Sequence, residues 1–134
     1  MSRAIPPVYR LISSPEWAAC RTTTSIPRSA IDERDGFVHL SGPDVFLETA
    51  TRYFRADQAP LALVIDPDRL PGVLRWEAVA ERDDTLFPHL YGAQIPTDAV
   101  VAVIEIVYRA GNAIEGTRRP YPSAASDDKD PTTT

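Results

Sequence analysis

Hydrophobic residues recur along the chain with two different periods, which predict a mixture of strands and helices. The run 61–66 is almost continuously apolar, as is typical of a central strand buried on both faces. The run 73–79 alternates instead, with one apolar face and one face that carries Arg75 and Glu77. Further strands are expected at 8–12, at 37–41, and from residue 99 or 100 to 108, the last being the longest.

Two segments carry helical signals. Ser14 and Pro15 are a hydroxyl cap followed by proline at the first helical position, so we expect a short helix through Cys20. A second helix is expected from Pro43, with Ser41 and Asp44 at the spacing of a capping box. Its apolar stripe has the helical spacing i, i+4, i+7 and i+8 and consists of Phe46, Ala50, Tyr53 and Phe54. The polar residues 21–35 are expected to form a loop or a broken helix.

The ratio of elements indicates the fold class. Only one or two main helices accompany five or six strands. About six residues join 61–66 to 73–79, which is too short for a parallel crossover. We therefore predict an α+β fold with a mixed, mostly antiparallel split sheet, rather than a doubly wound parallel sheet.

The composition changes after residue 110. Residues 111–134 contain few large apolar side chains and many Pro, Ser, Thr and Asp residues, so they bury too little surface to offset the entropy of ordering. We predict one globular domain at 1–110 and a disordered C-terminal tail at 111–134. Cys20 is the single cysteine, so a disulfide within the chain is excluded. We expect the Cys20 side chain to be buried as a small hydrophobic residue.

The charge pattern narrows the range of partners. The net charge is -5, with acidic and basic residues interspersed and no basic stripe, so nucleic-acid binding is not expected. An acidic surface repels anionic membranes, and no apolar run approaches the ~20 residues of a membrane span. The first seven residues lack the apolar stretch of a signal peptide. We therefore expect a cytoplasmic protein whose partner is a small-molecule ligand.

The first histidine lies in the run Gly36-Phe37-Val38-His39-Leu40-Ser41. A strand would place His39 and Ser41 on one face, just before the turn into the second helix. A helix N-terminus favours an anion or a ribose phosphate, so both residues are candidates for ligand binding. The structural alternative is a buried His39 tied to a backbone carbonyl, with Ser41 as a helix cap.

The second histidine lies in the run Phe87-Pro88-His89-Leu90-Tyr91-Gly92. Pro88 restricts Phe87 to extended geometry, so His89 and Tyr91 should project to one side. A histidine beside a tyrosine can bind a planar ring or share a proton. The structural alternative is a loop anchored by Phe87 and Tyr91.

Two glutamates are candidates for chemistry. Glu77 lies in a half-buried strand, where a carboxylate either pairs with an arginine, here Arg75, or has a shifted pKa suited to catalysis. Glu105 interrupts the apolar last strand and has the same alternatives. No metal site is predicted, because no histidine pair has the usual ligand spacing. The chain has no GxSxG, P-loop or GxGxxG motif.

The order of these motifs resembles the bacterial family catalogued as domain of unknown function 952. The resemblance covers roughly residues 7–109, and several separated motifs carry it: Gly36 to Ser41, Arg52-Tyr53-Phe54, Leu61 to Asp66, Trp76-Glu77, Phe87 to Gly92 and Val100 to Tyr108. It implies a fold like that of the ADP-ribosyltransferase superfamily, a split mixed sheet with a cleft for NAD.

That kinship would give the candidates specific roles. His39 and Ser41 would lie where such enzymes place a histidine, followed closely by Ser or Thr, against the nicotinamide-side ribose. Tyr53 or Tyr91 would be the aromatic residue that stacks on nicotinamide. Glu77 or Glu105 would be the glutamate that orients the acceptor.

Three functional hypotheses remain open. The first is a small-molecule site lined by His39, Ser41, Glu77, His89 and Tyr91 that binds NAD or a nucleotide-like ligand, with ADP-ribosyl transfer as its candidate chemistry. The second is a non-catalytic binding or regulatory module on the same scaffold. The third is a hydrolase in which His89 and Glu77 are a proton-transfer pair. The first requires both histidines to converge on one concave face.

Overall fold

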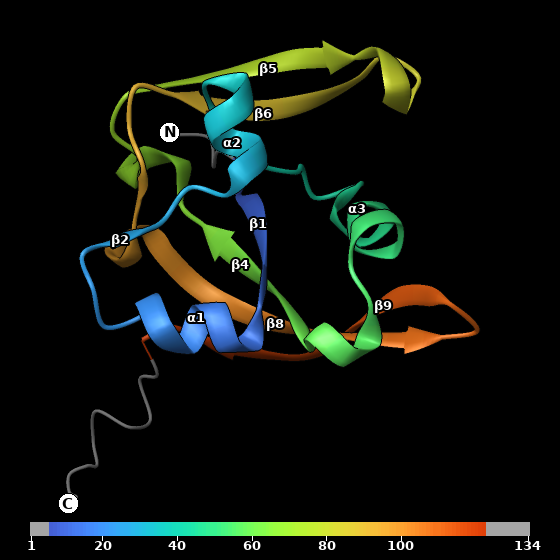
Figure 1. The fold of residues 1–134 in the computed structure, drawn as a ribbon. Coiled ribbons are helices and arrows are strands. Elements are labelled where there is room, and N and C mark those ends of the chain that lie inside the picture. Colours follow the sequence, from blue (N-terminus) through green and yellow to red (C-terminus); the bar gives the residue numbers. More distant parts are fainter. Residues whose placement is uncertain (1–5, 123–134) are drawn as a thin grey trace, which may run out of the picture.

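The apolar run 61–66 forms the centre of the larger of two main sheets. In the computed structural model, which describes residues 6–122, strand β4 (Pro60–Ile65) lies between β1 (Val8–Ser13) and β8 (Val100–Arg109), and β9 (Asn112–Pro120) adds to β8 (Figure 1). All these neighbours pair antiparallel. Two neighbouring strands and two covered faces explain why nearly every residue of β4 is apolar.

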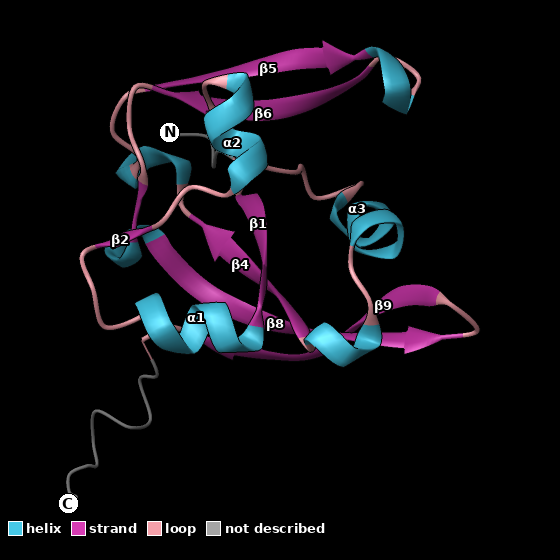
Figure 2. Ribbon diagram, in the orientation of Figure 1, coloured by secondary structure: helices cyan, strands magenta, loops and turns pink. Residues whose placement is uncertain are grey.

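A second sheet has three antiparallel strands in the order β3-β6-β5. They are β3 (Val38–His39), β6 (Thr85–Tyr91) and β5 (Val73–Val79). A third pairing joins β2 (Ser25–Ile26) to β7 (Ile95–Pro96). The α+β class and the antiparallel, split arrangement are confirmed. The short segment after β4 leads from one sheet to the other, so β4 and β5 are not neighbours (Figure 2).

Three α-helices are present in the described residues, where we predicted one or two. They are α1 (Ser14–Cys20), α2 (Ala30–Asp35) and α3 (Phe46–Tyr53). Single 3₁₀ turns occur at Ala56–Gln58, Pro67–Arg69, Ala80–Arg82 and Thr97–Ala99. Within residues 6–122, no helix has the length and apolar character needed to cross a membrane.

The helix boundaries differ from the predictions in two places. α1 is capped by Ser13, whose hydroxyl accepts from the Glu16 amide, and not by Ser14. α3 begins at Phe46 after Val45, without a side-chain cap, so the predicted capping box of Ser41 and Asp44 is wrong. The helix starts three residues late because a turn fills residues 43–45.

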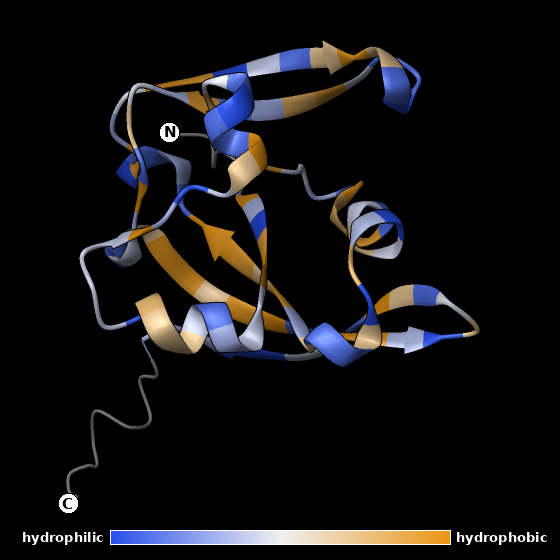
Figure 3. Cartoon of the chain, in the orientation of Figure 1, coloured by the Kyte–Doolittle hydropathy of each residue, from blue (hydrophilic) through white to orange (hydrophobic). Residues whose placement is uncertain are grey.

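Two apolar clusters hold the sheets and helices together. One lies between the two main sheets, where Leu63 and Ile65 of β4 pack in the same cluster as Val38 and Leu90. The other covers the opposite face of the large sheet with α3, where Tyr9 stacks on Phe46 with ring centroids 4.2 Å apart. The orange ribbon of β4 and β8 in Figure 3 marks the apolar strands that contribute to both clusters.

The segment after residue 110 corrects the prediction of a tail. Residues 112–120 form β9, paired with β8 along most of its length. Ala110 and Gly111 both have positive φ, as in a two-residue hairpin turn, and main-chain hydrogen bonds to β8 supply the order that side-chain burial does not. Tyr121 then packs edge-on against Trp17. The rest of the predicted tail, residues 123–134, lies outside the described residues.

Candidate histidine and carboxylate site

The two histidines face one another on the second sheet. His39 of β3 is the register partner of His89 of β6, so both side chains emerge on the same face. Their ring centroids are 5.7 Å apart. Phe37 lies against both rings, with its centroid 4.5 Å from His39 and 4.1 Å from His89, and 5.1 Å from Tyr91. These four rings form what we call the histidine cluster, and the predicted convergence of the two histidines is confirmed.

Strand β5 brings Glu77 to the His89 side of the cluster. Glu77 Oε1 accepts a hydrogen bond from the Tyr91 hydroxyl at 2.6 Å and lies 2.7 Å from His89 Nδ1. The bonds from Tyr91 and then His89 lower the pKa of Glu77, whereas Glu77 raises the pKa of the Tyr91 hydroxyl. An ionised Glu77 requires the proton on Nδ1, which leaves Nε2 of a neutral His89 as an acceptor.

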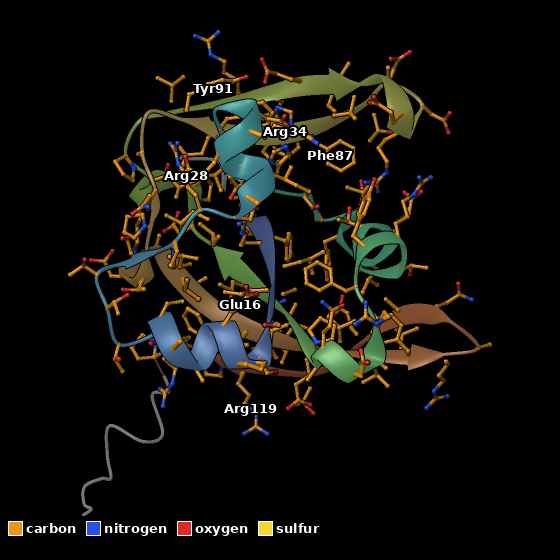
Figure 4. The ribbon with its side chains drawn as sticks, in the orientation of Figure 1. Glu16, Arg28, Arg34, Phe87, Tyr91 and Arg119 are labelled. Atoms are coloured by element: carbon orange, nitrogen blue, oxygen red, sulfur yellow. The ribbon has the colours of Figure 1, made fainter. Side chains whose placement is uncertain are left out.

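The accessibility of this group differs between its members. The His89 side chain is 7% exposed, while the Glu77 side chain is 39% exposed. Tyr91 lies near the end of β6, as the labelled side chain in Figure 4 shows, and the Arg75 guanidinium is 5.7 Å from its ring centroid. Glu77 therefore pairs with a histidine and a tyrosine, and not with Arg75 as the structural alternative supposed.

Helix α2 supplies the partners of His39. Asp32 Oδ1 lies 2.7 Å from Nδ1, and Asp35 Oδ2 lies 2.9 Å from Nε2. Because ionised carboxylates only accept, both contacts are satisfied together only when both ring nitrogens carry protons. The structural alternative for His39 named a backbone carbonyl, but its ring contacts two carboxylates.

Asp32 is the most deeply buried of the residues that sequence reasoning missed. It is 0% exposed. It pairs with Arg10 of β1, with Nη2 2.7 Å from Oδ2. It also accepts from the backbone amides of His39 and Ser29. Burial alone would raise the pKa of Asp32, but the hydrogen bonds from His39 and Arg10 outweigh it and hold the pKa well below its usual range.

The local sequence explains why α2 forms where a loop or broken helix was predicted. Ser29 and Asp32 make a reciprocal capping box at the start of the helix. Gly36 ends the helix with φ 83°, a left-handed conformation that glycine adopts without steric cost. This Ser-x-x-Asp spacing followed by glycine is the signal that could have revealed the helix and, with it, Asp32 and Asp35.

Three other predicted site residues make their contacts elsewhere. The Ser41 hydroxyl is buried and donates to Thr49, and its backbone bridges to Tyr9, which is a structural role. Tyr53 is 61% exposed on α3. Glu105 is exposed on β8 opposite Leu61 of β4, in the other main sheet. The structure therefore joins Glu77, His89, His39 and Tyr91 and leaves these three apart.

Two surface cavities lie away from the histidine cluster. The larger, of about 630 Å³, lies between α1 and the large sheet and includes Trp17, Leu61 and Tyr121. The smaller, of about 300 Å³, includes Glu105. Across residues 6–122, no group of three or more His, Cys, Asp or Glu side chains is arranged to hold a metal ion. The predicted concave character of the histidine face stays a prediction.

Comparison with known proteins places the chain among uncharacterised relatives. A family model described as "Protein of unknown function (DUF952)" matches residues 11–103. The crystal structure of protein CC0527 from Caulobacter crescentus is 33% identical and superposes with a TM-score of 0.70, covering 81% of this chain and 93% of that chain. The solution NMR structure of CC0527 is 29% identical, with a TM-score of 0.66 over 92% of this chain and 96% of that chain. No curated protein matches.

Proposed function

We propose, for a chain that belongs to the DUF952 family of proteins of unknown function, that the histidine cluster and Glu77 form a small-molecule site with His89 and Glu77 as its proton-transfer pair. The observation that carries the proposal is the shared carboxylate oxygen. Glu77 Oε1 lies within hydrogen-bond distance of both the His89 ring and the Tyr91 hydroxyl.

This arrangement suits acid–base chemistry. A carboxylate on Nδ1 fixes the tautomer and orientation of an imidazole and stabilises its protonated form. In a hydrolysis, His89 Nε2 would accept a proton from water as the water oxygen forms its bond to the substrate. The bond to the leaving group would then break, and the same proton would pass from Nε2 to that group. Tyr91 would hold Glu77 in place throughout.

The surroundings favour a ligand with a planar ring and hydroxyl groups. The rings of Phe37 and Tyr91 offer faces for stacking, and the partly exposed carboxylates of Glu77 and Asp35 can accept from sugar hydroxyls. Arg75, whose guanidinium lies beside the Tyr91 ring, is a cation that could contact a phosphate. A nucleotide-like ligand, with NAD or ADP-ribose as the first probes, fits this chemistry. The ADP-ribosyltransferase-like fold and the chemistry that it implies stay predictions.

A titration with NAD, ADP-ribose and a nucleotide panel, followed by product analysis, tests the proposal. Calorimetry should detect binding, and the Glu77→Gln variant should lose turnover while it keeps most of the binding. Glu105→Gln is the matched control, because Glu105 is the other candidate glutamate and lies on the other main sheet. Equal effects of the two substitutions would contradict the proposal.

One observation favours the non-catalytic module as a second candidate. Both ring nitrogens of His39 are already within hydrogen-bond distance of carboxylates, so this histidine reaches a ligand only if Asp35 moves away. Asp32 is fully buried, whereas the Asp35 side chain is 29% exposed. Binding without turnover, abolished by His89→Asn, would support the binding module over the hydrolase.

A further inference from the structure

Strand β5 is the outer strand of the second sheet. In the described part of the chain its one strand neighbour is β6, so its far edge pairs with no other strand. An open edge presents a row of N–H and C=O groups and is a template for another strand. β5 is seven residues long, so this edge is as long as a typical strand.

A proline in the neighbouring strand identifies the groups that face this edge. Trp76 lies opposite Pro88, which has no N–H, and the Pro88 carbonyl accepts from Leu40 on the β3 side. The Trp76–Pro88 pair is therefore not hydrogen-bonded. Because hydrogen-bonded and non-hydrogen-bonded pairs alternate in an antiparallel ladder, Leu74, Trp76 and Ala78 direct their N–H and C=O groups away from β6.

The side chains of β5 match those of a second β5 that runs antiparallel to it. Its sequence is Val-Leu-Arg-Trp-Glu-Ala-Val, with Trp76 at the centre. An antiparallel copy related by a two-fold axis at Trp76 places Arg75 opposite Glu77 twice, and Val73 opposite Val79 twice. Opposite charges on an edge strand disfavour most registers but stabilise this one.

Exposed apolar side chains lie along the hairpin that β5 forms with β6. Val73 is 51% exposed, Trp76 45% and Leu86 54%. Leu86 pairs with Ala78, so Trp76 and Leu86 share one face of the sheet. In the two-fold arrangement the two Trp76 side chains would lie side by side, and each would shield the other from water.

We propose that β5 pairs with β5 of a second copy of this chain, antiparallel and centred on Trp76, to form a continuous six-stranded sheet. The pairs Trp76–Trp76 and Leu74–Ala78 exchange the main-chain hydrogen bonds that the open edge offers. The arrangement also brings the second copy's Arg75 beside Glu77, the carboxylate that contacts His89 and Tyr91. The interface therefore reaches the edge of the histidine cluster on both copies.

A proline on the open edge of β5 should block the dimer contact and leave the fold of each chain intact. Ala78→Pro removes an N–H that faces away from β6, so the hairpin should form while the second copy is blocked. Ala78→Thr keeps the N–H and is the matched control. Light scattering after size-exclusion chromatography should give twice the chain mass of 14.8 kDa for the wild type and Ala78→Thr, and 14.8 kDa for Ala78→Pro.

A charge series tests the register independently and does not depend on the folding of the proline variant. Arg75→Glu places like charges opposite one another and should raise the dimer dissociation constant at least tenfold. Arg75→Lys should change it little, and the double variant Arg75→Glu, Glu77→Arg should restore pairing. A wild-type mass of 14.8 kDa at every concentration up to the solubility limit would overturn the proposal. A dimer unaffected by both Ala78→Pro and Arg75→Glu would overturn it as well.

Discussion

Replacement of Asp32 by Asn tests whether the carboxylate beneath His39 holds the two main sheets together. The substitution keeps the volume of the side chain but removes its charge. It also replaces one of the two accepting oxygens with an NH₂ donor. The groups around that position are themselves donors, namely Arg10, the His39 ring and two backbone amides. The Arg10 side chain is 11% exposed, so its guanidinium would be left in the interior without a carboxylate, while it still donates to the His39 carbonyl.

The magnitude follows from the burial of the pair. Removal of one partner from a buried ion pair costs about 3–5 kcal/mol, because the other charge stays desolvated. A domain of this kind has a total unfolding free energy of about 5–15 kcal/mol. With a urea m-value of about 2 kcal/mol per molar, a loss of about 4 kcal/mol lowers the unfolding midpoint by about 2 M.

Urea unfolding followed by tryptophan fluorescence measures this loss, since Trp17 is buried in the core between the sheets. Asp35→Asn is the control. It also contacts His39, but its side chain is 29% exposed, so a clearly smaller shift of the midpoint is expected. If the two variants shifted the midpoint equally, the reasoning that the Arg10–Asp32 pair carries the effect would be refuted.

Three further predictions rest on single groups. The pKa of folded Asp32 lies below its unfolded value near 3.8, so its contribution to stability is present above that value and lost as the pH falls. Between about pH 4 and 2, urea titrations should therefore show that the wild type loses stability faster than Asp32→Asn. Parallel curves of unfolding free energy against pH would count against this. Gly36→Ala should cost about 1–2 kcal/mol by the same assay, since a Cβ there meets no atom within 4 Å and the cost is backbone strain alone; Gly36→Asn should cost less. Burial raises the pKa of the Cys20 thiol, which is 4% exposed, so mass spectrometry should detect alkylation by iodoacetamide only after unfolding; rapid labelling of the folded protein would disprove this.

The elements that could be predicted are those whose burial is set locally. The apolar run of β4 and the alternation of β5 were read from the sequence because each strand's two faces impose a pattern on adjacent residues. β9 was missed because it is mostly exposed and owes its order to main-chain bonds with β8, which leave no hydrophobic pattern. α2 was predicted only as one alternative, a broken helix within 21–35, because its capping residues and not an apolar stripe mark it.

Part of the candidate site could also be predicted from the sequence. The family resemblance placed both histidines in one site, and the pairing of β3 with β6 brings them together across fifty residues of sequence. The sequence left Glu77 with two alternative partners, Arg75 and His89, and the structure pairs it with His89 and Tyr91. Spacing gave no reason to join Arg10 to Asp32, because that contact depends on how one sheet lies over the other.

The Arg10–Asp32 pair links the two main sheets. Arg10 belongs to the large sheet, and Asp32 belongs to the helix whose carboxylates hold β3 of the second sheet. The same guanidinium donates to the His39 carbonyl at 2.8 Å. The hairpin of β5 and β6 is therefore fastened through β3 to the first strand of the chain. Amide protons in β6 should exchange with solvent only when the whole domain opens, so that the two sheets form a single cooperative unit.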